Sequence, residues 1–132
     1  MSKIGVRRAA MQLVYARLMG GTGDADTLSE LIEYTEADAP DALSLADAVT
    51  RRQPEWAQAV ARFSPERAFE RIPSVPKAIL FVALYELNAV PDTPAAVAIS
   101  EAVEAAKRYA GEADARFVNG LLGAYQRARA DA

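Results

Sequence analysis

Apolar and polar positions along the chain repeat with the period of a helix rather than that of a strand. Apolar side chains recur three and four positions apart in most segments, whereas alternation of period two is hard to find. Alanine, the best helix former, accounts for 29 residues, and β-branched residues are sparse. The pattern therefore predicts an all-α protein of about seven helices in a single domain over residues 1–132.

Prolines and glycines divide this pattern into separate helices. Proline fits the first helical turn because its missing N–H would have no partner within the helix there. Five prolines stand where helices are expected to begin: Pro40, Pro54, Pro65, Pro76 and Pro94. We expect helices over about residues 6–19, 27–34, 41–51, 54–61, 78–88, 94–109 and 113–129, with a short helical turn over residues 64–71. Glycines at positions 20, 21 and 23 should end the first helix, and Thr93 should cap the sixth.

Residues 78–85 are apolar on nearly all sides of a helix, which is typical of the centre of a bundle. Near the end of this helix, Glu86 and Asn88 are expected to face water. In the last helix, Phe117 and Val118 are adjacent, so both side chains cannot point straight into the core. One of the two is therefore expected to be partly exposed.

The composition excludes several classes of protein. Because cysteine and histidine are both absent, there can be no disulfide framework, zinc finger, thiol nucleophile or Ser-His-Asp triad. We therefore expect no enzyme, no metal site and no cofactor. No run of about 18 apolar residues and no apolar leader is present, so we expect no membrane segment and a cytoplasmic location.

Charge is segregated along the chain although the formal net charge is only −3. Residues 1–23 carry four bases and no acid, and residues 24–47 carry eight acids and no base. An acidic chain of this kind can still bind a polyanion if its basic segments meet on one face. The ordinary alternative is that these charge runs are simply solvated faces.

Two short basic segments are candidates for nucleic-acid contacts. Arg7 and Arg8, with Lys3, open the first helix, where backbone N–H groups also favour phosphate but positive side chains do not favour the helix. Arg116 beside Phe117 is a pairing in which an unpaired base can stack while a phosphate is held. A core role for Phe117 is the equal alternative. Gly120 interrupts this helix at a cost in stability, which suggests a gain such as close backbone approach.

The same residues resemble those of the bacterial NusB family. The similarity lies in five stretches that fall in the family's order: RRAAMQLVY at 7–15, RIPSVPKAIL at 71–80, ALYEL at 83–87, ISEAVEAAK at 99–107 and FVNGLL at 117–122. The resemblance spans the chain and is strongest from Arg71 onward. It implies a bundle of two small helical subdomains, about residues 1–63 and 64–132.

The resemblance also implies a function. Proteins of this family are transcription antitermination adaptors that bind boxA-type single-stranded RNA together with NusE, a ribosomal small-subunit protein, in an RNA polymerase antitermination complex that supports ribosomal RNA transcription. The residues implied in RNA binding are Lys3, Arg7, Arg8, Gln12, Tyr15, Arg116, Phe117 and Asn119. Those implied on the side that meets NusE are Glu70, Arg71 and Lys77. Either a monomer or a homodimer that covers the RNA face fits this resemblance.

A protein–protein interaction module of the same fold, with lost or weak RNA binding, is the alternative. Ile4, Gly5 and Val6 dilute the arginine cluster that usually opens the family's first helix, and the net charge is negative. A third hypothesis, the helical domain that precedes some ribosomal RNA methyltransferases, is disfavoured because we expect no methyl-donor domain in this protein.

Overall fold

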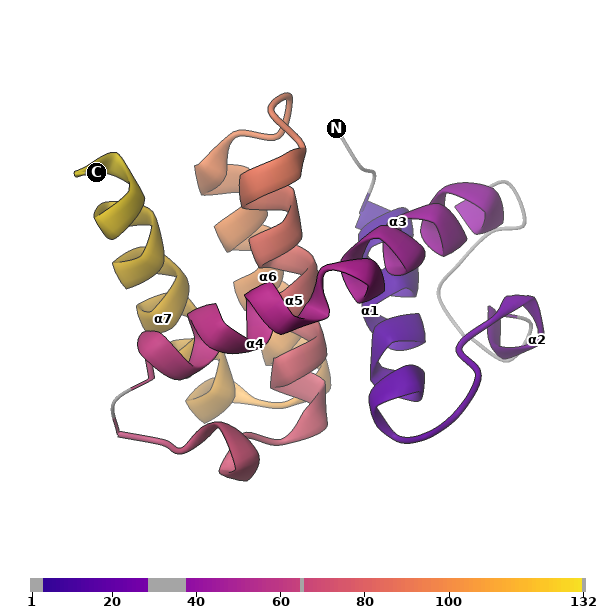
Figure 1. Cartoon of the computed structure of the whole chain (residues 1–132), viewed down its shortest axis with the longest axis horizontal. Helices are drawn as coiled ribbons and strands as arrows, with labels where there is room; N and C mark the ends of the chain where they lie inside the picture. The colour runs from indigo at the N-terminus through magenta and orange to yellow at the C-terminus, as the bar shows by residue number, and fades with distance from the viewer. Residues whose placement is uncertain (1–3, 29–37, 65, 132) are drawn as a thin grey trace.

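The computed structural model describes residues 4–28, 38–64 and 66–131. Within these ranges the chain forms seven α-helices, one 3₁₀ helix and no strand, which confirms the all-α prediction (Figure 1). The elements are α1 (Ile4–Leu18), α2 (Ala25–Leu28), α3 (Ala39–Arg51), α4 (Gln53–Arg62), the 3₁₀ helix η2 (Phe69–Arg71), α5 (Ser74–Ala89), α6 (Ala95–Tyr109) and α7 (Glu112–Ala130).

Helix α5 is the centre of the bundle. It packs against α1 on one side and against α6 and α7 on the other, while α4 crosses it (Figure 1). All six residues from Ile79 to Leu84 are buried, as the apolar pattern predicts for a central helix. Because full burial of one large apolar side chain stabilises a fold by about 1.5–3 kcal/mol, this helix is a major source of the stability.

Proline positions agree with the observed helix starts, with one shift. Pro40 and Pro54 lie in the first turns of α3 and α4. Helix α5 begins at Ser74, two residues before Pro76, so the start is earlier than expected. Pro76 still lies within the first turn, where the helix requires no N–H from it. Pro65 and most of the helix expected over 27–34 lie outside the described residues, and α2 covers Ala25–Leu28.

The ends of two helices test the expected caps. After α1, Gly20 adopts a φ of +90°, and the N–H of Gly21 donates to the carbonyl of Ala16 at 2.8 Å, so the predicted glycine stop is confirmed. The expected cap of α6 by Thr93 is wrong. Pro94 occupies the N-cap position, and the Thr93 hydroxyl instead donates to Oε2 of Glu86 at 3.4 Å.

Asn88 is exposed as expected, but Glu86 is not. The Glu86 side chain is only 1% exposed, inside the bundle between α1 and the turn before α6. The expectation that it faces water is wrong because it has charged and polar partners in the interior. The described residues contain no helix long and apolar enough to cross a membrane. The division into subdomains near residue 63 stays a prediction.

Candidate nucleic-acid interface

Arg7, which was expected to contact an RNA backbone, lies inside the protein. Its residue is 3% exposed, and its Nε donates to Oε1 of Glu86 at 2.7 Å. Nη2 of the same guanidinium is also buried and has no hydrogen-bond acceptor among the described residues. A charge removed from water in this way needs its partner, because desolvation is otherwise very costly. The structure thus ties α1 to α5 through Arg7, and the expectation of a surface contact has to be corrected.

The remaining candidates on α1 lie closer to the surface. Arg8 and Gln12 are half-buried, and Tyr15 is 38% exposed. Gln12 and Tyr15 line a small cavity of about 270 Å³ beside the first turns of α5 and the end of α6; its other lining residues are Met11, Val75, Ala78, Ile79 and Tyr109. This wall is largely apolar. Lys3 lies outside the described residues.

In α7, one of the adjacent residues Phe117 and Val118 is a core residue and the other is partly exposed. Val118 is fully buried, whereas Phe117 is partly exposed at the edge of the core. Arg116 is exposed beside it. Arg116 and Phe117 line the same cavity, with a volume of about 530 Å³. The structure therefore brings a partly exposed aromatic ring and an arginine together.

A third side chain, Arg67, joins this pair from the segment after α4. Its Cζ lies 4.4 Å from the centroid of the Phe117 ring, and its Nη1 donates to Oδ1 of Asp114 at 3.3 Å. Sequence reasoning missed Arg67, because the ring and the guanidinium belong to segments fifty positions apart and no periodic pattern links them. The signal available in the sequence was a basic residue in a short proline-containing turn.

Asn119 does not belong to this cavity. It is exposed on another flank of α7, where it lines a shallow groove of about 420 Å³ with residues of α6 such as Ser100 and Glu104. The predicted RNA-binding residues therefore do not form one cluster. Gln12 and Tyr15 line one cavity, Arg116 and Phe117 a second, and Asn119 a third.

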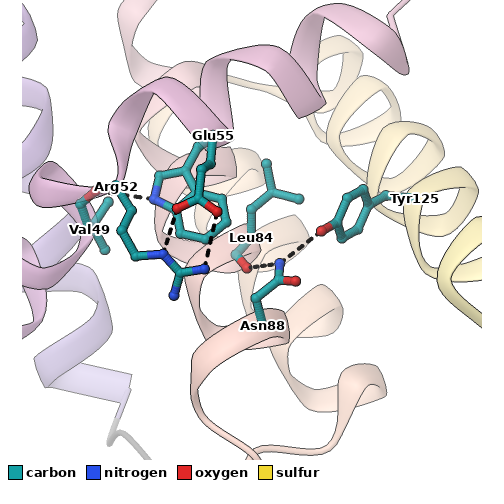
Figure 2. Close-up of polar contacts among 7 residues, drawn as sticks. Val49, Arg52, Glu55, Leu84, Asn88 and Tyr125 are labelled. Atoms are coloured by element: carbon teal, nitrogen blue, oxygen red, sulfur yellow. Dashed lines mark hydrogen bonds and ion pairs between the residues drawn. The ribbon is translucent and has the colours of Figure 1, made fainter.

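Contacts among α4, α5 and α7 hold the two walls of the larger cavity in place. Nδ2 of Asn88 donates to the Leu84 carbonyl at 2.7 Å and to the Tyr125 hydroxyl at 2.8 Å, which joins α5 to α7 (Figure 2). The Tyr125 ring in turn meets Phe63 edge to face at 5.5 Å between centroids. The segment after α4 is thereby fixed beside α7.

The start of α4 carries the ion pair seen in Figure 2. Nε of Arg52 donates to Oε2 of Glu55 at 2.6 Å, and Nη2 donates to Oε1 at 3.2 Å. This hydrogen bond lowers the pKa of the Glu55 carboxyl and raises that of Arg52. Cζ of Arg52 also lies 4.9 Å from the Trp56 ring centroid. The pair is exposed, so it contributes little to the stability of the fold.

The three residues expected to meet a protein partner lie near one another on η2 and α5. Glu70 and Arg71 are exposed on η2, and Lys77 is half-buried in the first turns of α5. Nζ of Lys77 lies 4.1 Å from the Phe69 ring centroid, so part of its charge is directed at an aromatic face. The two elements therefore present charges of both signs beside an aromatic side chain.

Comparisons with known proteins agree with the fold and with the resemblance to the NusB family. The model of the NusB family matches residues 5–127. The transcription antitermination protein NusB of Shewanella amazonensis is 35% identical over 118 residues, which cover 88% of each chain.

Two solved structures are also similar. T. maritima NusB superposes with a TM-score of 0.77 at 27% identity, covering 93% of this chain and 89% of that one. A structure of the antitermination factors NusB and NusE in complex with double-stranded RNA superposes with a TM-score of 0.78 at 23% identity, covering 95% of this chain and 96% of that one. At that identity the second likeness supports the fold alone.

Proposed function

The chain belongs to the NusB family, and on this premise we propose that it is a transcription antitermination adaptor that binds boxA-type single-stranded RNA together with NusE. In this role it supports ribosomal RNA transcription as a component of the RNA polymerase antitermination complex. It acts in the cytoplasm and carries no catalysis of its own. The family match over residues 5–127 is the observation that carries this proposal.

The proposed RNA surface includes Arg116 and Phe117. In the proposal the partly exposed Phe117 ring stacks on a base, and Arg116 supplies a positive charge beside it for the adjoining phosphate. The proposal also includes Arg8, Gln12 and Tyr15 on α1, Asn119 on another flank of α7, and Lys3 ahead of α1, as RNA contacts outside the cavity of Arg116 and Phe117. Arg7 is given a different role, in which its bond to Glu86 positions α1 and the residues that follow on it.

The proposed NusE surface comprises Glu70, Arg71 and Lys77. Their charges of both signs, beside the Phe69 ring, suit a partner whose surface is also mixed. Charge complementarity there would affect the association rate and the choice of partner more than the total affinity.

The burial of Arg7 favours one alternative, a protein–protein module with weak RNA binding. Each phosphate contact contributes about 0.7 to the salt slope for single-stranded RNA, so the loss of Arg7 from the surface reduces both the affinity and its salt dependence. This alternative keeps the NusE surface unchanged, and the two functions therefore differ in RNA binding alone.

Fluorescence anisotropy separates these two functions. A labelled boxA-type strand and a scrambled strand are titrated with the protein, with and without NusE from the same organism, at two salt concentrations. Antitermination predicts binding that prefers the boxA sequence and tightens with NusE. A salt slope near zero and no preference with NusE present would leave only the protein–protein module.

A further inference from the structure

The cavity lined by Arg116 and Phe117 has walls from two separate parts of the chain. One wall is the segment after α4, and the other is the first half of α7. The residues that line its volume of about 530 Å³ are Phe63, Ser64, Glu66, Arg67, Arg116, Phe117, Gly120 and Leu121. Sites that hold small organic ligands span about 300–1,000 Å³, so this cavity has room for one nucleotide. Phe117 and Arg116 belong to the proposed RNA surface, whereas the other residues that line the cavity do not.

Arg67 forms a cation–π pair with Phe117. With Cζ 4.4 Å from the ring centroid, the guanidinium covers one side of the ring. Two contacts hold the arginine there: the bond of Nη1 to Asp114 at 3.3 Å, and the Ser64 hydroxyl, which donates to the Arg67 carbonyl at 2.8 Å. The Arg67 side chain still keeps 35% of its surface exposed. It is therefore both positioned by the protein and accessible to a ligand.

Gly120 has no visible packing reason to be a glycine. It lies within α7, where glycine is a poor helix former, and its φ is not in the left-handed region. A Cβ built at this position meets no atom of the described residues within 4 Å. The close approach of another segment, which the sequence suggested, is thus not present in the described part of the chain. The effect of the missing side chain is instead to leave open space in the wall of the cavity.

The charges around the cavity favour a nucleobase over a bare phosphate. Arg67 and Arg116 are opposed by Glu66 in the lining and by Asp114, the partner of Arg67. A phosphate would be repelled by these carboxylates, whereas a base is neutral and offers both donors and acceptors. Arginine planes and aromatic rings are the surfaces on which unpaired RNA bases stack.

We propose that this cavity is a slot for one unpaired nucleobase of the bound RNA. The base stacks on the wall formed by Arg67 and Phe117, and the missing side chain of Gly120 leaves room for it. The proposal rests on RNA binding by this chain, which is the proposed function. It adds Arg67 and Gly120 as positions that determine how tightly the RNA is held.

The first test compares alanine substitutions at two glycines of α7. Gly120→Ala would extend into the cavity, whereas Gly123→Ala would meet only the far end of the flexible Arg127 side chain, at 3.3 Å. Both variants should raise the melting temperature, because alanine favours the helix. Only Gly120→Ala should weaken binding of the boxA-type strand, by about fivefold or more. If Gly120→Ala and Gly123→Ala bind the boxA-type strand with equal affinity, the proposed slot is wrong, whether or not that affinity is below the wild-type value.

The second test uses two arginines that each lie over a phenylalanine ring. Arg67→Ala should weaken RNA binding by about fivefold or more, while Arg62→Ala, which removes a cation 5.2 Å from Phe63 and does not line the cavity, should leave it unchanged. Arg67→Lys keeps the charge but loses the planar group. It should therefore behave like Arg67→Ala if stacking matters.

A base analogue reports the slot directly. In a set of RNA strands that each carry 2-aminopurine at a different position, the wild-type protein should quench the fluorescence of one strand. This quenching should be lost with Gly120→Ala and Arg67→Ala. It should be kept with the control variants Gly123→Ala and Arg62→Ala. RNA binding without such a position, or quenching that survives in both cavity variants, would overturn the slot and leave the proposed function intact. No RNA binding by the wild-type protein would overturn both.

Discussion

The guanidinium of Arg7 and the carboxylate of Glu86 form an ion pair with Nε 2.7 Å from Oε1, although the two residues are 79 positions apart and both are buried. The pair joins the first turn of α1 to the last turn of the central helix α5. The Thr93 hydroxyl, in the turn before α6, adds a second polar contact by donating to Oε2 of Glu86. Three elements thus meet at one buried charge pair.

Removing one member of this pair should destabilise the protein strongly. Glu86→Ala leaves the Arg7 guanidinium buried without its counter-charge, and such a break costs about 3–5 kcal/mol. The double variant Arg7→Met/Glu86→Leu removes both charges, and its stability should lie close to that of the wild type. Urea unfolding measures both. A double variant as unstable as Glu86→Ala would mean that the two charges do not act as a pair.

The same double variant tests the revised role of Arg7. If Arg7 contacts no phosphate, Arg7→Met/Glu86→Leu should bind the boxA-type strand with the wild-type salt slope. A slope lower by about 0.7, the contribution of one phosphate contact on single-stranded RNA, would return Arg7 to the RNA surface. The measurement is anisotropy at several salt concentrations.

Phe117→Ala should weaken RNA binding and should destabilise the fold less than the loss of a fully buried phenylalanine. Base stacking on an aromatic ring is worth about 1–3 kcal/mol, so the affinity should fall by that amount. The loss in unfolding free energy should stay below the about 3–5 kcal/mol typical of a fully buried phenylalanine, because Phe117 is partly exposed. Phe81→Ala, at a fully buried position, provides the comparison for stability. A full core penalty at Phe117 with unchanged affinity would assign it to the core alone.

Arg116→Ala should reduce the salt dependence of RNA binding. Loss of one phosphate contact lowers the slope by about 0.7 for a single strand. Arg127→Ala removes another exposed arginine from the same helix, far from the cavity, and should leave the slope near its wild-type value. If both substitutions lower the slope equally, the net charge of α7 and not a contact at Arg116 governs the binding.

The exposed ion pair of Arg52 and Glu55 at the start of α4 should depend on pH. The hydrogen bond from Arg52 lowers the pKa of Glu55, so any stability from this pair is present above the ordinary pKa and is lost as the pH falls through the lowered pKa. Arg52→Ala should raise the pKa of Glu55 toward its ordinary value, whereas Arg51→Ala should not change it. The carboxyl carbon shift of Glu55, followed by NMR during an acid titration, shows which occurs.

Sequence reasoning succeeded where the cause is local. Proline positions and the glycines after α1 marked helix ends because backbone geometry and the missing N–H act within one helical turn. The apolar stretch over residues 78–85 marked the central helix because burial on all sides leaves a composition that one segment shows by itself. The site was anticipated only in part. Phe117 and Arg116 share a cavity, whereas Arg7 is buried and Asn119 lies elsewhere.

The sequence by itself determined an all-helical chain, its main helix ends and its resemblance to one family, because these follow from neighbours within a few positions and from motifs in order. Only the tertiary structure decided that Glu86 is buried with Arg7 and that Arg67 lies over Phe117. A charged residue at a helix end has the same local pattern whether it faces water or a distant partner. Which of the two occurs depends on how helices pack, since packing alone brings together side chains that are far apart along the chain.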